Sequence, residues 1–417
     1  METNLNNIFK AVRKSSRIIS AMTDAKRAEV LMNLATAVDA SHDELLEANA
    51  ADLQRMDTAN PLYDRLRLTP ERLTAIADDI RHVAQLPSPV GEVMEERVLP
   101  NGLQLRRVRV PFGVIGVIYE ARPNVTFDVF SLCFRSGNAC ILKGGSDASA
   151  SNDAIIRLIH DVLSECGVTT DCVALLPSTH EATAALLNAV GYVDVCIPRG
   201  GRRLIDFVRD NARVPVIETG AGVVSAYFDK DGDTAMGRDI ITNAKTRRVS
   251  VCNALDTLLI HRDRLTDLPA LCENLAEKGV EIHADEKSYR ALEGHYPASL
   301  LKTTDETTYT TEWMDYKMGL RTVGCLEDAL EHIAEYGSGH SECIITGNPV
   351  TAEHFQQSVD AACVYVNAPT SFTDGAQFGL GAEIGISTQK LGPRGPMGLR
   401  EITTYKYLIN GNGQTRP

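Results

Sequence analysis

The chain has 417 residues, of which 44% are hydrophobic and 23% are charged, as is usual for globular proteins. This length predicts two or three domains rather than one. The formal net charge of −13 argues against a general nucleic-acid binder or a protein of anionic membranes. No apolar run approaches membrane-spanning length, and the N-terminus lacks the basic and apolar regions of a signal peptide. We therefore expect a cytoplasmic protein with neither membrane nor nucleic acid as a partner.

The cysteines predict neither a metal site nor a disulfide framework. There are ten of them, with no Cys-x-x-Cys pair and no regular spacing to histidine. Most lie within apolar runs, which is typical of a reducing compartment.

The first part of the chain, about 8–95, is predicted to be helical. Ala25–Ala35 shows apolar residues at helical spacing, and a Pro/Gly-containing break at Pro87–Gly91 ends this region. Next, Asn101 and Gly102 stand between two alternating runs within Arg97–Val108, which predicts a β-hairpin.

From Val114 onward, predicted strands alternate with predicted helices. The strands are Val114–Ile118, Ala139–Leu142, Cys172–Leu176, Val193–Ile197 and Val214–Glu218, and the helices include Ala150–Leu163 and His180–Ala189. This alternation predicts an α/β fold with a parallel sheet and crossover helices, a dinucleotide-binding architecture. No Gly-x-Gly-x-x-Gly motif follows the first strand.

A second α/β unit is predicted from about Tyr227. Its expected elements are a strand at Leu255–Ile260, a helix at Leu265–Lys278 and a strand at Ser341–Thr346. Near the C-terminus, Ile402–Ile409 is β-branched and aromatic, and this predicts a final strand.

One segment combines a cysteine with basic residues. Asn243–Ala254 places Cys252 at the end of a predicted helix, behind Lys245, Arg247 and Arg248. Nearby positive charge lowers a thiol pKa and favours the nucleophilic thiolate. The alternative is that Cys252 is a small buried hydrophobe, the usual role of a free cysteine.

The segment upstream strengthens the catalytic interpretation. Val214–Gly222 is predicted to be a buried strand that ends in Glu218 and a glycine-rich turn. A Glu-Xaa-Gly turn followed at this distance by a lone cysteine resembles the aldehyde dehydrogenase superfamily. Longer blocks resemble the gamma-glutamyl phosphate reductases within it, and they follow that family's order: Val110–Thr126, Ile197–Gly201, Tyr336–Ser341, Gly395–Leu399 and Thr403–Tyr407.

The resemblance implies an aldehyde dehydrogenase-like α/β fold. It has a Rossmann-type cofactor domain, an α/β catalytic domain and a small β oligomerisation flap. The implied bounds are 1–96 and 111–224 for the NADPH-binding domain, 225–382 for the catalytic domain and 97–110 with 399–412 for the flap.

The resemblance also implies a reaction, in which L-glutamyl 5-phosphate is reduced by NADPH to L-glutamate 5-semialdehyde with release of phosphate. This is the second step of proline biosynthesis from glutamate. Cys252 would attack the acyl phosphate and form a thioester. Asn124 matches the family's side-chain amide donor to the oxyanion, and the backbone N–H of Cys252 would be the second donor. Alternatively, Asn124 caps a helix that begins near Val125.

Cofactor contacts are implied at two turns. Lys143, with Gly144 and Ser146 after it, should lie near the adenosine ribose and its 2′-phosphate. Arg199, Gly200 and Gly201 open a helix whose N-terminus suits the pyrophosphate. The alternative for both segments is an ordinary turn.

Glu218 has more than one possible role. In hydrolytic relatives the equivalent carboxylate activates water. In a phosphate reductase, where water attack would be wasteful, we expect it to position the cofactor or to bond to backbone amides.

Substrate or phosphate contacts are implied at Arg122, Lys245, Arg247 and His340. The alternatives are solvated faces for the charge clusters and a satisfied surface position for the histidine. The chain departs from the family pattern at Val223–Ser225, where Asn-Cys-His is usual, and at Val249, where proline is usual. These departures affect the expected details of the loop that carries Glu218.

The resemblance implies a homodimer or larger homo-oligomer and transient contact with glutamate 5-kinase. Two rival interpretations remain. One is a CoA-acylating or hydrolytic semialdehyde dehydrogenase on the same scaffold, because one fold carries many chemistries. The other is a non-catalytic nucleotide-binding or structural protein, against which the intact Cys252, Asn124 and Lys143 argue.

Overall fold

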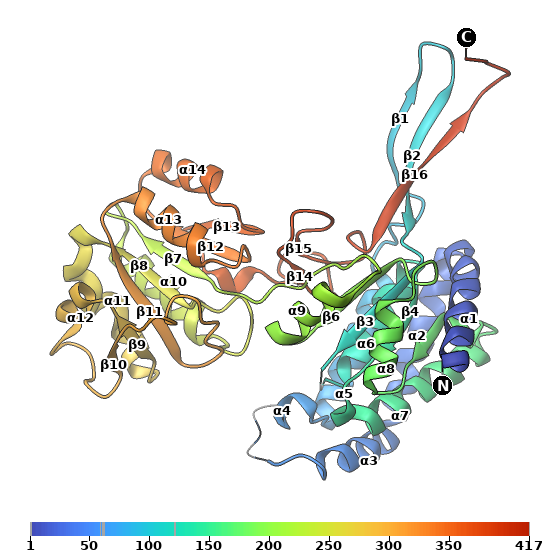
Figure 1. Ribbon diagram of the computed structural model, residues 1–417, viewed down its shortest axis with the longest axis horizontal. Coiled ribbons are helices and arrows are strands. Elements are labelled where there is room, and N and C mark those ends of the chain that lie inside the picture. The colour runs from blue at the N-terminus through green and yellow to red at the C-terminus, as the bar shows by residue number, and fades with distance from the viewer. Residues whose placement is uncertain (1, 59, 61–62, 121, 417) are drawn as a thin grey trace. The chain divides into compact units, whose positions relative to one another are not determined.

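The computed structural model describes residues 2–58, 60, 63–120 and 122–416, with the side chains of residues 2 and 3 left aside. Ala121, inside one of the family-like blocks, lies outside the described residues. The chain forms two compact units (Figure 1). Unit 1 comprises Met1–Thr219, Gly379–Gly385 and Met397–Pro417, and unit 2 comprises Gly220–Phe378 and Ile386–Pro396.

Helices form the N-terminal part of unit 1, as predicted. They are α1 (Glu2–Ala21), α2 (Asp24–Ala40), α3 (His42–Leu53), α4 (Tyr63–Leu66) and α5 (Pro70–Gln85). Thr23 and Thr69 cap α2 and α5, since each side chain accepts a hydrogen bond from a backbone N–H in the first turn. The helical region ends slightly earlier than predicted, because β1 (Val93–Val98) begins at Val93.

The core of unit 1 is a four-stranded parallel sheet in the order β5-β4-β3-β6 within the described residues. Its strands are β3 (Val114–Tyr119), β4 (Ala139–Lys143), β5 (Val173–Leu175) and β6 (Val195–Arg199). Every residue of β3 is buried, because helices cover both faces of a parallel sheet. Four of the five predicted strands are thus confirmed.

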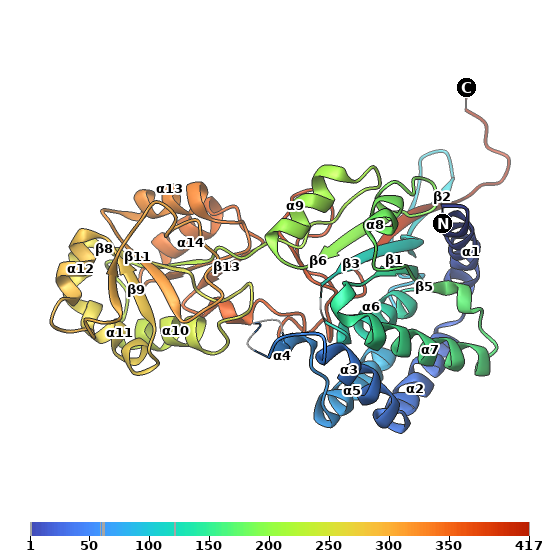
Figure 2. The same cartoon turned by 60° about the horizontal axis from the view of Figure 1, so that its bottom comes forward.

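Helices and short 3₁₀ turns connect these strands. They are α6 (Asn124–Arg135), η1 (Ser146–Ala148), α7 (Ser149–Glu165), η2 (Thr170–Cys172), α8 (His180–Leu187) and α9 (Arg202–Asn211). Helix α6 packs on α7, and α8 packs on α1 and α9 (Figure 2). The predicted helices at 150–163 and 180–189 correspond to α7 and α8.

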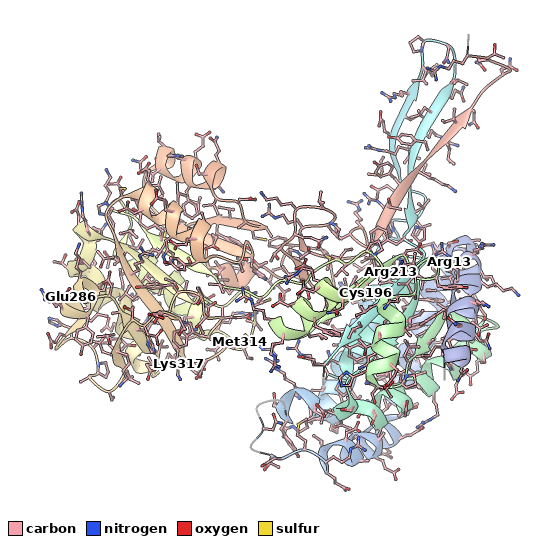
Figure 3. The ribbon with its side chains drawn as sticks, viewed as in Figure 1. Arg13, Cys196, Arg213, Glu286, Met314 and Lys317 are labelled. Atoms are coloured by element: carbon pink, nitrogen blue, oxygen red, sulfur yellow. The ribbon has the colours of Figure 1, made fainter. Side chains whose placement is uncertain are left out.

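The fifth predicted strand, Val214–Glu218, is wrong as a regular element. Within this range only Val216 forms an isolated bridge, to Cys196 of β6. Figure 3 labels Cys196 and, just before the predicted strand, Arg213. Cys196 N donates to Pro215 O at 2.8 Å, and Ile217 N donates to Cys196 O at 3.0 Å. Pro215 has no N–H to donate, which limits a regular ladder along this edge.

An antiparallel sheet of β1, β2 (Gln104–Pro111) and β16 (Thr403–Asn410) completes unit 1. The predicted hairpin is confirmed: Leu99 N donates to Leu103 O at 2.8 Å, and Gly102 has a φ of 84°. The predicted C-terminal strand corresponds to β16. This sheet, expected as the flap, belongs to unit 1.

Unit 2 is built on a seven-stranded parallel sheet in the order β10-β9-β11-β8-β7-β12-β13, counted in the described residues. The strands are β7 (Ser225–Phe228), β8 (Thr257–His261), β9 (Glu281–Ala284), β10 (Leu301–Thr303), β11 (Lys317–Val323), β12 (Ser341–Ile345) and β13 (Cys363–Val366). Separate apolar cores lie on its two faces, one under α10–α12 and one under α13 and α14. A short antiparallel pair, β14 (Ile386–Ser387) and β15 (Gly395–Pro396), belongs to the same unit.

The helices of unit 2 are α10 (Thr234–Thr246), η3 (Arg262–Asp267), α11 (Leu268–Glu277), α12 (Glu286–Leu292), α13 (Leu326–Tyr336), α14 (Pro349–Ser358) and η4 (Thr370–Phe372). The helix predicted from Leu265 begins as the 3₁₀ turn η3, and α11 starts at Leu268 with Pro269 in its first turn. Among the described residues, no helix is both long and apolar enough to cross a membrane.

Asp52 gives a stability test of unit 1. Its buried carboxylate accepts hydrogen bonds from the backbone N–H groups of Ala150 at 3.0 Å and Ser151 at 2.7 Å, at the start of α7. In Asp52→Ala these donors lose their acceptor, and we expect the free energy of unfolding to fall by about 2 kcal/mol. Urea denaturation measures this change. Glu47→Ala, at an exposed position of the same helix, is the matched control and should stay near wild type; equal midpoints for the two variants would contradict the capping role.

Candidate active site

Cys252 lies in unit 2, on the segment that connects α10 to β8. The residue is half-buried. Helix α10 ends at Thr246, so Cys252 is not at the helix end as predicted but on the irregular segment beyond it. The chain folds back here because Leu255 N donates to Ala244 O at 3.0 Å. Cys252 therefore precedes the amino end of a strand at the centre of the sheet.

The backbone of Gly222 packs directly against the backbone of Cys252. A Cβ atom on Gly222 would overlap the carbonyl oxygen of Cys252 and would lie 2.9 Å from its Cα. Gly222 N also donates to Glu312 Oε1 at 3.0 Å. The glycine-rich turn predicted from the sequence thus has a steric function, since only a residue without a side chain fits beside Cys252.

A second contact fixes the residue after the cysteine. Asn253 Nδ2 donates to Thr373 O at 2.9 Å, and Thr370 Oγ1 donates to Asn253 O at 2.9 Å. Both partners belong to the segment around η4. Sequence reasoning did not select Asn253 or the η4 segment, because their contact joins residues far apart in the chain.

His340 belongs to the network behind this segment. Its side chain is fully buried, and Nδ1 lies 2.8 Å from Ser341 Oγ, which lies 2.7 Å from Thr373 Oγ1. Burial lowers the pKa of His340 to about 4, so the ring is neutral at neutral pH. The alternative prediction, that His340 is a hydrogen-bonded surface residue, is therefore wrong. Its neutral, buried ring is also poorly suited to binding phosphate.

The basic cluster before Cys252 is divided by burial. Arg247 and Arg248 are exposed, whereas Lys245 is fully buried and does not lie on a solvated face. Burial lowers the pKa of Lys245 to about 8, although the charges of Asp256 and Asp315 act in the opposite direction. Burial likewise raises the pKa of Asp256 to about 7, opposed by Lys245. Lys245 is thus part of the interior of unit 2, in the last turn of α10, rather than of its surface.

In unit 1, Asn124 is the first residue of α6. Pro123 before it already has helical backbone angles, with φ −57° and ψ −35°. The interpretation of Asn124 as the N-cap is therefore wrong, because an N-cap residue lies outside the helical region. Its side chain instead donates from Nδ2 to Asp128 Oδ2 at 3.0 Å, one turn along the helix. Arg122 is half-buried just before this turn.

The turn after β4 borders a pocket. Lys143 is half-buried at the end of this strand, and burial lowers the pKa of its ammonium group. The pocket has a volume of 350 Å³ and includes Gly144, Asn152 and Thr179 in its lining. Ser146 follows on the exposed side of the turn. Asn152 and Thr179 were not predicted, although the turn at Pro177 and Ser178 after β5 is a recognisable signal.

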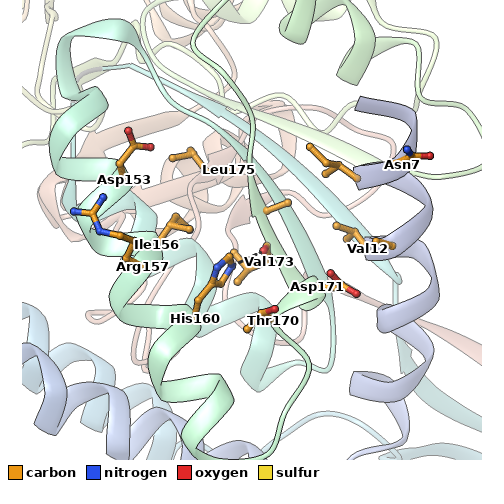
Figure 4. A pocket seen from close by; sticks show the side chains of 13 residues that line it. Asn7, Val12, Asp153, Ile156, Arg157, His160, Thr170, Asp171, Val173 and Leu175 are labelled. Carbon is orange, nitrogen blue, oxygen red and sulfur yellow. Dashed lines mark hydrogen bonds between the residues drawn. The ribbon is translucent and has the colours of Figure 1, made fainter. Parts of the chain in front are cut away.

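A larger cavity of unit 1, of 540 Å³, lies along the outer edge of β5 between α1 and α7 (Figure 4). In it, His160 Nε2 lies 3.1 Å from Val173 O. No predicted site residue lines it.

The glycine turn after β6 leads into α9, as predicted. Here Gly201 N donates to Glu120 Oε2 at 3.0 Å, so a carboxylate lies where the pyrophosphate is expected. The guanidinium of Arg199 donates a hydrogen bond to the carbonyl of Ile384, and Glu218 Oε2 lies 3.7 Å from Arg209 Nη1.

In the part of the chain that the structure describes, no three or more His, Cys, Asp or Glu side chains lie close enough together to hold a metal ion.

Gly222→Ala tests the steric contact with Cys252. The added methyl group must displace the cysteine segment, so we expect catalytic activity to fall by roughly 10²-fold. Alkylation of Cys252 by iodoacetamide, followed by peptide mass spectrometry, should become faster as the segment loosens.

Gly201→Ala is the control for the alkylation rate, measured without cofactor. Its methyl group would meet no atom of the described residues within 4 Å. Unchanged activity in Gly222→Ala would show that the close approach does not fix the cysteine.

The chain is similar to known proteins over its whole length. The model of the aldehyde dehydrogenase family matches residues 1–289. The chain is 61% identical to a gamma-glutamyl phosphate reductase of Bacteroides thetaiotaomicron, over 100% of both chains, and 59% identical to one of Bacteroides fragilis, over 99% of this chain and 100% of that one.

Solved structures agree with these matches. The crystal structure of gamma-glutamyl phosphate reductase from Thermotoga maritima is 39% identical, with a TM-score of 0.95, over 99% of this chain and 100% of that chain. An acetylating aldehyde dehydrogenase from Geobacillus thermoglucosidasius is 15% identical, with a TM-score of 0.70, over 100% of this chain and 98% of that chain, and shares the fold.

Proposed function

Because this chain belongs to the aldehyde dehydrogenase family and, within it, to the gamma-glutamyl phosphate reductases, we propose that it reduces L-glutamyl 5-phosphate to L-glutamate 5-semialdehyde. The reaction uses NADPH, releases phosphate and is the second step of proline biosynthesis from glutamate. The predicted resemblance and the predicted α/β fold are both confirmed. A full-length relative at 61% identity carries this proposal.

Cys252 is the proposed nucleophile. Its sulfur attacks the acyl carbon, and the C–O bond to phosphate breaks, so that a thioester forms and phosphate leaves. When bound, a nicotinamide cofactor would supply the hydride that reduces this thioester. The resulting thiohemiacetal then collapses, releasing the aldehyde and restoring the thiol. An acyl phosphate is already activated, so the first step needs a well-placed sulfur, which the contacts of Gly222 and Asn253 provide.

The negative charge on the reacting oxygen needs hydrogen-bond donors. We assign this role to the side-chain amide of Asn124 and to the backbone N–H of Cys252. Removing one such donor typically lowers the rate by ~10²–10³. The hydrogen bond from Asn124 Nδ2 to Asp128 Oδ2, one turn along α6, holds this amide and supports the assignment.

The cofactor is proposed to be NADPH, whereas the family supports a nicotinamide cofactor in general. Lys143, Gly144 and Ser146 would bind its adenosine end, beside the pocket that follows β4. Arg199, Gly200 and Gly201 would face the pyrophosphate at the start of α9, once the Glu120 carboxylate leaves Gly201 N. Glu218 would position the cofactor.

The anionic substrate needs basic groups. Arg122 and the exposed Arg247 are the proposed contacts. Lys245 and His340 are fully buried, and we assign them to supporting the cysteine segment.

The three-stranded sheet supports the proposed homo-oligomer. Val98, Ile409 and Tyr405 on it are 69%, 56% and 48% exposed, and such a cluster favours association. We also propose contact with glutamate 5-kinase and a cytoplasmic location. Among the described residues no disulfide joins any of the ten cysteines, which suits a reducing compartment.

The reverse reaction tests the proposed chemistry. With glutamate semialdehyde and NADP⁺, we expect NADPH to form continuously only when phosphate is present, because phosphate must resolve the thioester. Cys252→Ala should abolish turnover, while Cys325→Ala, a half-buried cysteine of the same unit, should retain it. Continuous turnover without phosphate would mean that water resolves the thioester, as in a hydrolytic dehydrogenase.

Lys143→Ala tests cofactor selectivity. Loss of a charged contact to the 2′-phosphate should raise the KM for NADPH by roughly 10- to 100-fold. The KM for NADH should change much less, because NADH lacks this phosphate. Steady-state kinetics with both cofactors measure the ratio, and an equal effect on the two would remove Lys143 from the 2′-phosphate site.

A further inference from the structure

Asp128 is a half-buried carboxylate to which the proposed reaction assigns no role. It lies one turn after Asn124 on α6, and its Oδ2 accepts the hydrogen bond from Asn124 Nδ2 at 3.0 Å. The side chains of residues four apart on a helix are neighbours, so the helix itself sets this pair. Helix α6 is buried along most of its length, which holds its first turn in place.

Two other charged groups surround this carboxylate. Arg199 at the end of β6 attracts it, and Asp79 on α5 repels it. Arg199 is itself fixed, because its guanidinium bonds to the carbonyl of Ile384. Asp128 is thus a half-buried carboxylate influenced by one opposite and one like charge.

We propose that Asp128 is a positioning residue, which fixes the direction of the Asn124 amide so that an N–H group faces the developing oxyanion. This inference rests on the proposed function. An asparagine side chain can present either its oxygen or its nitrogen, and the two orientations differ only by rotation about the last side-chain bond. A carboxylate accepts hydrogen bonds and donates none, so Asp128 selects the orientation in which nitrogen lies on its side. The second hydrogen on Nδ2 then remains for the substrate oxygen.

The arrangement predicts a pH effect. Burial raises the pKa of Asp128 to about 6, partly offset by Arg199 and by the bond from Asn124. Below this pKa the carboxyl is protonated and can donate to the amide oxygen, which favours the wrong orientation. Activity should therefore fall as the pH drops through about 6 and reach its full value above it.

Kinetics of single and double variants test the inference. Asp128→Ala should lower kcat by roughly 10²-fold, the cost of a misplaced reacting geometry, with the KM for NADPH within about twofold. Asp128→Asn can donate as well as accept, like the protonated carboxyl, so its activity should stay near the low-pH level of wild type and show no decline near pH 6. Asp161→Asn, at an exposed position of α7, is the matched control and should behave as wild type.

The double variant separates positioning from a general structural role. If Asp128 acts through Asn124, then Asn124→Ala with Asp128→Ala should be no slower than Asn124→Ala alone. Additive losses, or a wild-type pH profile in Asp128→Asn, would overturn the inference. Failure of the proposed function is distinguishable, because wild type would then show no phosphate-dependent turnover at any pH.

Discussion

The position of Cys252 depends on backbone contacts with other loops, because its own segment contains no helix or strand. Gly222 lies so close to it that a side chain could not be accommodated, and the η4 segment holds Asn253 by the amide and the carbonyl. Behind these contacts, buried polar groups such as His340 connect the η4 segment to the start of β12. In the proposed reaction the acyl phosphate is already activated, so a sulfur that its neighbours hold in place is what the first step needs.

Parallel sheets explain how these loops come together in each unit. In unit 2, the Gly222, Cys252 and His340 loops lead into β7, β8 and β12, with β7 between its two neighbours in the sheet. In unit 1, β3 lies between β4 and β6, and the strand order reverses there. In α/β folds, ligands bind at the carboxyl ends of the strands beside such a reversal. Lys143 is the last residue of β4, and Asn124 begins the helix that follows β3.

The sequence was sufficient for most of the elements and for the selection of Cys252 as the candidate nucleophile. Buried parallel strands read as continuous apolar runs, so β3 and β4 could be placed almost to the residue. The strand predicted at Val214–Glu218 was wrong because the prediction rested on the apolar pattern alone. That pattern does not show that Pro215 lacks the backbone N–H which a regular strand would use. Burial of Lys245 and His340 could not be predicted either, since both look like surface residues until distant segments cover them. The Asn124–Asp128 contact was readable from the spacing of four residues, but the N-cap interpretation competed with it.

Covalent trapping on Cys252 tests the central claim most directly. The protein is mixed with glutamate semialdehyde and NADP⁺ without phosphate, quenched in acid and digested, and the peptides are analysed by mass spectrometry. We predict one burst of NADPH per active site and a glutamyl adduct on the Cys252 peptide, which added phosphate removes. A burst with no adduct there, or an adduct on another cysteine, would contradict the account.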